Sequence, residues 1–240
     1  MKYPIILVGA PTYEGKEYSR ERYIHNISRL NYPNYHWCLV DNTAHTRYYN
    51  KLKRKHPRNI FRVPRGKNSR DGIANSMNFL RHKVLDEGYE YLMIVESDLF
   101  PDEDVIQRLL SHNDLVVGHP YYIGFGENKH LCVSVPHKTD EGLWGTRFLT
   151  PEESAQALDG TKKRVQGMGV GCVLIHRSIL ERYSFWYSYV DDDRLDAGAL
   201  KKHPDVYFYM DLWNDQVPVY LDTSVVIPHD NKSWHLVKDA

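Results

Sequence analysis

The stretch that decides the fold is "YEYLMIVESDLFPDEDVI", which runs from Tyr89 to Ile106. Its first half contains an unbroken apolar run, Tyr91–Val95, of the kind found in strands that are buried on both faces. The run ends in two carboxylates, Glu96 and Asp98, with one serine between them. Pro101 and the acids that follow it are typical of a helix start. The sequence therefore predicts a central strand that carries two charges out of an apolar core at its carboxyl end.

Strands and helices alternate through the first half of the chain. The strands that we predict are Pro4–Gly9, His36–Asp41, Ile60–Val63 and Tyr91–Val95, and the helices are a stretch with Tyr23 and Leu30 on one face, Thr46–Lys55, Ser69–Glu87 and Val105–Leu110. The strongest helix, Ser69–Glu87, begins with a Ser/Asp cap and stops at Gly88. This order predicts an α/β fold with a mixed, mostly parallel sheet flanked by helices. Ligands bind such sheets at the carboxyl ends of the strands, where Glu96 and Asp98 are expected.

The second half of the chain has a different pattern. Gly118–Gly160 is rich in glycine, proline, histidine and aromatic residues, which predicts loops and short antiparallel strands in a smaller region beside the main sheet. The segments that follow are a glycine turn, strand and helix in "GMGVGCVLIHRSILERY", a helix in "DVYFYMDLWNDQ", and the strands "VPVYLD" and "SVVIPHD". The last strand is expected to end at His229. We expect a single domain, residues 1–240, with functional halves 1–117 and 118–240.

Composition narrows the function. Lys plus Arg and Asp plus Glu number 31 each in 240 residues, so the chain as a whole has no field for polyanions or acidic partners. Its three cysteines lie far apart in apolar contexts, which predicts small buried side chains and a reducing compartment. No apolar run approaches the roughly 18 residues of a membrane span, and no cleavage pattern follows the first apolar run. We therefore expect a cytoplasmic protein.

Glu96 and Asp98 are the first candidates for chemistry. An acid-x-acid triplet places both carboxylates on one face of an extended segment, with Cα atoms about 7 Å apart. Two such oxygen ligands can hold Mg²⁺ or Mn²⁺ and leave positions open for phosphate oxygens. The alternative is a helix-capping turn, because Ser97 and Asp98 shortly precede a helix start.

The triplet and its surroundings resemble family 2 glycosyltransferases with the GT-A fold. Besides the triplet, five motifs occur in the family's order: "ILVGAPTYEG", "HWCLVDN", "GIANSMNFLR", "GMGVGCVLIHR" and "HPDVYFYMDLWNDQVPVYLDTSVVIPH". The first two resemble the opening strands that end beside the nucleotide base, and the last resembles the closing segment with its terminal histidine. The resemblance extends from Ile5 to His229.

This resemblance implies a nucleotide-sugar site in the first half of the chain and an acceptor site in the second. Thr12, Tyr13 and Asp41 would contact the nucleobase, and Asn75 would lie near the nucleotide. The residues expected on the donor side are Thr12, Tyr13, Asp41, Arg70, Asn75, Glu96 and Ser97.

Two departures from the family pattern decide the remaining roles. The usual Asp-x-Asp is Glu-x-Asp here, so Asp98 keeps the role of metal ligand and the role of Glu96 is less defined. The usual Glu-Asp pair near the end is Pro204-Asp205, so Asp205 inherits the role of catalytic base. His229 is the expected second metal ligand.

Elementary chemistry agrees with these roles. A divalent ion at Asp98 would stabilise the negative charge that builds on a departing diphosphate. An imidazole at His229 would favour Mn²⁺ over Mg²⁺, although a lone histidine can also be purely structural. Asp205 would take the proton of the acceptor hydroxyl, unless it only caps a helix. Asp191–Asp193 are rivals for that role or a solvated loop, and inversion at the anomeric carbon is implied by the resemblance alone.

The acceptor side is less sharply defined. Gly169 is interpreted as a point of close backbone approach to a sugar, or as a bulge. Trp144 and Trp213 can stack on sugar or base rings, or belong to the core. Asn50–Arg70 contains nine Lys or Arg and no acid. This stretch is a solvated face, a contact to the donor diphosphate through Arg70 or its neighbours, or a basic stripe for nucleic acid, so a hydroxylated DNA base stays open as the acceptor.

We therefore expect a metal-dependent, inverting glycosyltransferase of the hexosyltransferase type, with Mn²⁺ or Mg²⁺ as cofactor. Its partners would be a nucleoside diphosphate sugar, UDP-linked by first preference, and an unidentified hydroxyl acceptor. Two alternatives stay open. A sugar-nucleotide pyrophosphorylase also places acids after a strand, but "GAPTYEGKEY" is a poor version of the glycine-rich, basic loop that it needs. A non-catalytic carbohydrate or nucleic-acid binding module would have the fold without the chemistry.

Overall fold

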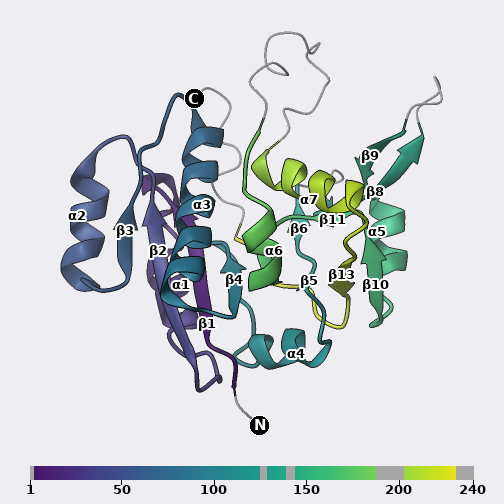
Figure 1. The fold of residues 1–240 in the computed structure, drawn as a ribbon, viewed down its shortest axis with the longest axis horizontal. Helices are drawn as coiled ribbons and strands as arrows, with labels where there is room; N and C mark the ends of the chain where they lie inside the picture. Colours follow the sequence, from purple (N-terminus) through teal and green to yellow (C-terminus); the bar gives the residue numbers. More distant parts are fainter. Residues whose placement is uncertain (1–2, 125–128, 139–143, 188–202, 231–240) are drawn as a thin grey trace.

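An eight-stranded mixed sheet forms the centre of the protein, with strand order β10-β13-β5-β12-β4-β1-β2-β3 (Figure 1). The computed structural model describes residues 3–124, 129–138, 144–187 and 203–230. The strands of the central sheet are β1 (Ile6–Thr12), β2 (Tyr35–Asp41), β3 (Ile60–Arg62), β4 (Tyr91–Val95), β5 (Val116–Gly118), β10 (Lys162–Val165), β12 (Cys172–His176) and β13 (Val219–Asp222). The structure confirms the predicted α/β class with a large sheet flanked by helices.

The helices and two small antiparallel sheets surround this centre. The helices are α1 (Arg20–Ile27), α2 (Thr46–Lys55), α3 (Ser69–Glu87), α4 (Val105–Ser111), α5 (Pro151–Ala157), α6 (Arg177–Arg182) and α7 (Pro204–Asn214), with a 3₁₀ turn η1 (Glu14–Lys16) after β1. The small sheets combine β8 (Val133–Lys138), β9 (Trp144–Phe148) and β11 (Gly167–Met168), and β6 (Tyr122–Ile123) with β7 (His130–Leu131). In Figure 1, α2 lies beside β3 at one side of the molecule, and β8, β9 and α5 lie at the opposite side.

The order of the strands fixes where a ligand site is expected. β1 pairs in parallel with both β2 and β4, so the chain first builds the sheet on one side of β1 and then continues on the other. The order in which strands are added to the sheet therefore reverses between β1 and β4. A ligand crevice usually lies at such a point in folds of this kind. β12 then enters antiparallel between β4 and β5, which makes the sheet mixed.

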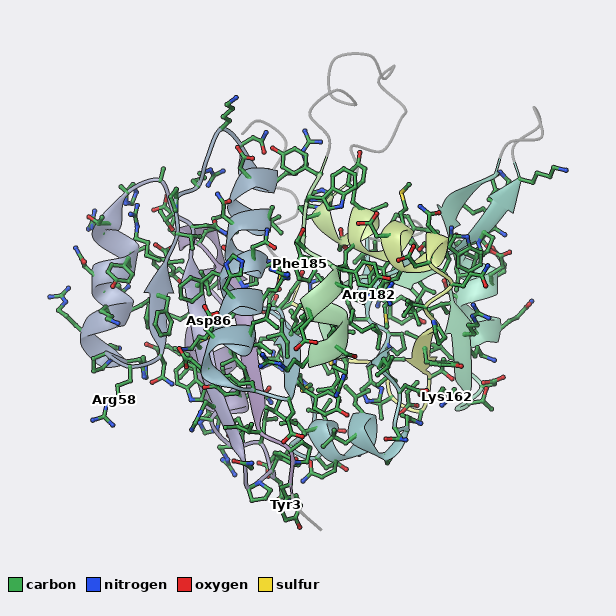
Figure 2. All side chains as sticks on the ribbon, in the orientation of Figure 1. Tyr3, Arg58, Asp86, Lys162, Arg182 and Phe185 are labelled. Carbon is green, nitrogen blue, oxygen red and sulfur yellow. The ribbon has the colours of Figure 1, made fainter. Side chains whose placement is uncertain are left out.

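Successive side chains of each strand point alternately into two hydrophobic cores, one on each face of the sheet. In β4, Leu92 and Ile94 join the core that α3 covers, whereas Met93 and Val95 join the core that α1 covers. Both faces are apolar because a strand covered by helices on both sides has no solvent face. Phe185 lies between α3 and α6 in the side-chain view and stacks on Phe208 of α7, with ring centroids 4.5 Å apart (Figure 2).

Several predicted bounds agree with the structure and a few do not. The bounds of α2, α3 and β4 coincide with those predicted, although α3 is capped by Asn68 and not by a Ser/Asp pair. β1 continues past Gly9 to Thr12. The predicted strand ending at His229 is wrong, because this segment forms only isolated bridges, Tyr121 to Ile227 and Leu99 to His229.

Candidate active site

Three strand ends bring polar residues to the same edge of the sheet. Thr12 and Asp41 are paired in register at the carboxyl ends of the parallel strands β1 and β2. Glu96 directly follows β4, the other parallel neighbour of β1, and its backbone N–H donates to the carbonyl of Gly171 at 2.8 Å. The expected base-contacting residues therefore lie on one side of the point where the strand order reverses, and the acid-x-acid triplet lies on the other.

Asp41 is a fully buried carboxylate with one oxygen satisfied and one not. Oδ1 accepts hydrogen bonds from the backbone N–H and the hydroxyl of Thr43, at 3.2 and 2.6 Å. Within the described part of the chain, Oδ2 has no hydrogen-bond partner, and the nearest cation, the Nε of Arg62, is 3.7 Å away. Burial raises the pKa of Asp41, although the bonds from Thr43 oppose the shift. A buried oxygen of this kind is costly unless a ligand donor meets it.

Asp98 lies at the centre of the acidic strand tip and is fully buried. Its Oδ2 accepts from the ammonium of Lys16 and from the hydroxyl of Tyr18, at 3.1 Å for the latter. The Nε2 of His229 lies 3.3 Å from the same oxygen. In the described residues, Oδ1 has no hydrogen-bond partner. One oxygen of Asp98 is therefore crowded with donors, while the other is buried without a partner in the described residues.

The backbone holds His229 against this tip. The segments of Asp98 and His229 run antiparallel, with Phe100 N–H donating to the Pro228 carbonyl at 3.1 Å and Asp230 N–H to the Asp98 carbonyl at 3.0 Å. The Nδ1–H of His229 donates to the carbonyl of Tyr122 at 2.8 Å. The ring of Tyr121 packs edge-on against the imidazole, with centroids 5.3 Å apart. The structure therefore brings Asp98 and His229 together across a separation of 131 residues.

The charged groups of the tip shift one another's pKa values. The pKa of Glu96 is raised to about 7, first by burial and then by the negative charge of Asp98. Burial alone would raise the pKa of Asp98, but the hydrogen bond from His229 and the charge of Lys16 outweigh it, so this pKa is lowered. Burial would lower the pKa of Lys16 and of His229, but the neighbouring Asp98 raises both. The tip thus contains an ionised Asp98 held between cationic groups.

The residues of the tip fit a divalent ion, with part of its coordination left to a ligand. The described residues contain no group of three or more His, Cys, Asp or Glu side chains that could hold a metal. Asp98 nevertheless has an Oδ1 without a hydrogen-bond partner in the described residues, and the Tyr122 carbonyl fixes a proton of His229 on Nδ1, so the ring nitrogen that faces Asp98 is Nε2. Mg²⁺ and similar ions are often held by one or two protein ligands plus substrate phosphates. Asp98 and His229 have the chemistry of such a pair.

Asp205 lies near the tip, in the first turn of α7. Burial raises the pKa of Asp205, and its charge in turn contributes to the raised pKa of Glu96 and of Tyr121. The interpretation of Asp205 as a helix cap is wrong, because the cap position is occupied by His203. The rival acids Asp191–Asp193 lie outside the described residues.

The other residues expected on the donor side differ in their placement. Ser97 is buried, and its carbonyl accepts from the Ser19 hydroxyl at 2.7 Å. Tyr13 follows β1, with its ring so close to Gly15 that a side chain there would collide with it. Asn75 is exposed on α3 and donates to the Pro64 carbonyl at 3.1 Å. Arg70 is buried near the start of α3, with its guanidinium 5.1 Å from the ring centroid of Tyr187.

The acceptor-side residues are less closely grouped. A side chain at Gly169 would collide with the hydroxyl of Tyr121, so the close neighbour that requires glycine here is a protein ring. Trp213 is 39% exposed in the last turn of α7, about 12 Å along the helix from Asp205. Trp144 begins β9, and its side chain lies outside the described part of the chain.

Lys16 and Tyr18 are members of the site that motif analysis missed. Both follow β1 in the sequence "EGKEY", 82 and 80 residues before Asp98. The sequence could have suggested them only through their position after the first strand. The segment after β1 and the segment after β4 lie at the same edge of the sheet.

The basic stretch Asn50–Arg70 is largely used within the chain. Lys51 pairs with Glu17, and Lys55 lies 3.5 Å from Glu21, so α2 is tied to the region around α1. The ammonium of Lys53 donates to the Ile60 carbonyl at 2.8 Å. Arg58 extends away from the body of the protein in Figure 2. These contacts favour the interpretation as a solvated face.

Solved structures place this architecture among known folds. GalNAc-T7, crystallised with UDP, GalNAc and Mn²⁺, aligns over 95% of this chain and 44% of its own, with a TM-score of 0.61 and 13% identity. TarS 1–349 of S. aureus aligns over 95% of this chain and 61% of its own, with a TM-score of 0.50 and 12% identity. The protein has the GT-A fold. A197 from STIV also aligns, over 94% of this chain and 85% of its own, with a TM-score of 0.45 and 14% identity.

These similarities extend to structure and not to sequence. No family model matches the chain, and no curated protein matches its sequence. The chain spans less than two thirds of GalNAc-T7 and of TarS. Among the helices of the described residues, none has the length and apolar character needed to cross a membrane.

Proposed function

We propose that the protein is a metal-dependent, inverting glycosyltransferase that moves a sugar from a nucleoside diphosphate sugar, UDP-linked by first preference, to a hydroxyl acceptor. The observation that carries this proposal is the pairing of Asp98 with His229 beside the point where the strand order reverses, with Nε2 and Oδ2 3.3 Å apart and the other oxygen of Asp98 without a partner in the described residues. GalNAc-T7, which has the same fold, was crystallised with UDP and Mn²⁺.

The donor base would lie against the ends of β1 and β2. The unsatisfied Oδ2 of Asp41 can accept a hydrogen bond from an N–H of the base, such as the imide of uracil. Thr12, the register partner of Asp41, and Tyr13, which follows it, would contact the same base. The tip residues Glu96 and Ser97 then face the ribose and phosphate end of the nucleotide.

Asp98 and His229 would hold the divalent ion between the protein and the diphosphate. When bound, the ion supplies Lewis-acid stabilisation of the negative charge on the leaving diphosphate. Asp98 would contribute its carboxylate and His229 its Nε2, while the Tyr122 carbonyl keeps the ring oriented. His229 would hold a metal only in its neutral form, so metal binding should weaken as the pH falls.

Asp205 would accept the proton of the acceptor hydroxyl as that oxygen attacks the anomeric carbon. Its raised pKa makes it a stronger base than an exposed aspartate while it is ionised. The charge of Asp205 contributes to the raised pKa of Glu96, which supports a place for Asp205 close to the tip. Attack by a hydroxyl held at Asp205, opposite a diphosphate held at Asp98, inverts the anomeric centre.

The test is a donor and metal screen followed by a matched pair of variants. Thermal shifts with UDP, GDP, CDP and TDP sugars in the presence of Mn²⁺ identify the donor, and release of its nucleoside diphosphate is then measured with Mn²⁺ and with EDTA. We expect turnover only with metal, and a loss of at least about 100-fold in Asp98→Asn, since the metal contributes several kcal/mol. Asp86→Asn makes the same chemical change at an exposed position of α3 and should keep full activity.

Three outcomes contradict the proposal. Full activity of Asp98→Asn would show that Asp98 does not hold a metal that the reaction needs. Release of pyrophosphate from a nucleoside triphosphate and a sugar phosphate indicates a pyrophosphorylase. Binding of a sugar nucleotide with no turnover over any acceptor or water indicates a binding module.

A further inference from the structure

Lys16 is a lysine that the fold places on the acidic tip. It ends η1, directly after β1, and its ammonium donates to Oδ2 of Asp98. Its side chain is 17% exposed, whereas the lysines of α2 that form ion pairs, Lys51 and Lys55, are 50% and 60% exposed. An ammonium is rarely withdrawn from water unless a carboxylate compensates it. The Lys16–Asp98 contact is therefore a built feature of the tip.

The contact places Lys16 on the carboxylate that would hold the metal. Oδ2 of Asp98, which accepts from Lys16, also lies 3.3 Å from Nε2 of His229, so an ion held by this aspartate and this histidine would lie close to the ammonium. The charge of Lys16 also acts on Glu96, the second carboxylate of the triplet. A lysine and a divalent cation at contact distance from one carboxylate repel each other strongly in a partly buried site. Both cannot remain in these positions.

The region that faces Lys16 indicates where a displaced ammonium can go. Lys16 and Tyr18 leave β1 at the same sheet edge as Asp41 and Glu96, between the place proposed for the base and the place proposed for the metal. A diphosphate that joins those two places passes this segment. An ammonium that loses Asp98 can pair there with a phosphate oxygen, which is a strong charge-assisted partner.

We propose that Lys16 is an internal cation that neutralises Asp98 until the donor arrives, and that the divalent ion and the diphosphate together move it from the carboxylate to a phosphate oxygen. This inference rests on the proposed function and adds a coupling between the binding of the divalent ion and the binding of the nucleoside diphosphate. The ion alone must displace Lys16 without giving it a new partner, so the ion binds weakly. With a nucleoside diphosphate present, the displaced ammonium is compensated, so each ligand strengthens the binding of the other.

The experiment measures Mn²⁺ affinity, by the EPR signal of free Mn²⁺ and by calorimetry, with and without UDP. Lys16→Met keeps the apolar stem and removes the charge. We expect Mn²⁺ alone to bind this variant about tenfold or more tightly than the wild type, since one nearby charge changes an equilibrium at such a site by this order. We also expect UDP to strengthen Mn²⁺ binding less in the variant than in the wild type.

Two further variants separate charge from structure. Lys16→Arg keeps the cation and should retain the weak Mn²⁺ binding of the wild type. Lys83→Met removes a lysine of similar burial, 14% exposed and paired with Glu87 on α3, and should leave Mn²⁺ affinity unchanged. Circular dichroism of each variant confirms that it is folded, and Lys16→Gln replaces Lys16→Met should the latter not fold.

The results separate this inference from the proposed function. Equal Mn²⁺ affinity in wild type and Lys16→Met, with metal-dependent turnover intact, overturns the role of Lys16 alone. Tighter Mn²⁺ binding by Lys16→Arg as well shows that charge is not the cause and also overturns it. Absence of Mn²⁺ binding in every protein, with and without UDP, overturns both proposals.

Discussion

Asp205 shows at the scale of one residue how the fold prepares a carboxylate for proton transfer. It occupies the first turn of α7, where its Oδ1 accepts from the backbone N–H of Val206 at 2.9 Å. Burial raises its pKa, and that effect outweighs the nearby His203 and the hydrogen bonds from the backbone N–H groups of Val206 and Asp205. A raised pKa is the property that the proposed role as a base requires.

Asp205→Asn is the change that tests this role. The amide has the shape of the carboxylate but cannot accept the hydroxyl proton, so we expect kcat to fall by about 10²–10⁴-fold. Affinity for UDP and Mn²⁺ should stay the same, because the tip at Asp98 is untouched. The measurement is steady-state transfer together with calorimetric UDP binding. A fall in UDP affinity of the same size as the fall in kcat would place Asp205 in the donor site instead.

The part of the candidate site that the sequence could suggest is the part with a motif. Asp98 was proposed from the acid-x-acid triplet after a strand, whereas Asp41 at the end of β2 and His229 were proposed chiefly through the family resemblance. Lys16 has no such motif, since its contact with Asp98 is defined by the pairing of β1 with β4. The unsatisfied oxygens of Asp41 and Asp98 are likewise invisible in sequence, because they depend on which donors arrive from distant segments.

At the scale of elements, α3 is specified by its ends. Its N-cap is Asn68, whose side chain accepts from the backbone N–H groups of Arg70 and Asp71. Its C-cap is Gly88, in the left-handed conformation with φ 79° and ψ 22°. Because these end signals surround one long apolar stripe, the bounds of the helix could be read from sequence to the residue.

Gly88→Ala isolates the contribution of that end. No described atom lies within 4 Å of the position of an added Cβ, so the effect is backbone strain alone. We expect a loss of about 1 kcal/mol in the free energy of unfolding, the cost of a left-handed alanine. Gly88→Asn should lose less, because asparagine tolerates this conformation. Urea unfolding measures both, and equal stability of Gly88→Ala and wild type would contradict the expectation.

Elements without a complete pattern were predicted less well. α5 was missed although Thr150 and Glu153 form a capping box, because the apolar stripe behind this signal is short. Ser224–His229 has the composition of a strand, but its partners at Leu99 and Tyr121 lie in two different segments, so only single bridges form. The antiparallel entry of β12 between β4 and β5 has no local signal at all.

Asp222 links two elements in a way that makes stability depend on pH. It ends β13, and its Oδ2 lies 2.9 Å from Nε2 of His112 at the end of α4, while Oδ1 accepts from Ser224 N–H at 2.9 Å. Burial would raise the pKa of Asp222, but these bonds outweigh it and lower the pKa to about 2. An aspartate with a depressed pKa stabilises the fold above its unfolded pKa of about 3.9, by about 2 kcal/mol, and loses this contribution as the pH falls toward 2.

Asp222→Asn should therefore cost more at pH 5.5 than at pH 3, where roughly half of the ionic contribution of wild type is gone. Urea unfolding at the two pH values gives the difference in free energy between wild type and variant. Asp86→Asn, on the exposed face of α3, is the control, and its difference from wild type should not change with pH. A cost of Asp222→Asn that is the same at both pH values would show that its ionisation does not stabilise the fold.

At the scale of the whole molecule, the two halves of the sequence share one sheet. β12, from the second half, lies between β4 and β5, and β13 lies on the far side of β5. Each half therefore completes the hydrogen bonding and the apolar cover of the other. A chain that is interleaved in this way is expected to unfold as one cooperative unit, which is the content of the single-domain prediction.

The three cysteines can test this expectation, because they report on both halves and on both cores. Cys38 lies in β2 and in the core under α3, while Cys132 and Cys172 belong to the second half and to the opposite core. All three are buried free thiols, and burial raises the pKa of each to about 12, so native thiols should not react with a disulfide reagent at neutral pH. With rising urea, we expect the thiols of both halves to become reactive at one midpoint, equal to that of the circular dichroism transition.

Labelling followed by mass spectrometry assigns each site. Exposure of Cys132 and Cys172 at a lower urea concentration than Cys38 would show that residues 118–240 open separately, and the single-domain prediction would then be wrong.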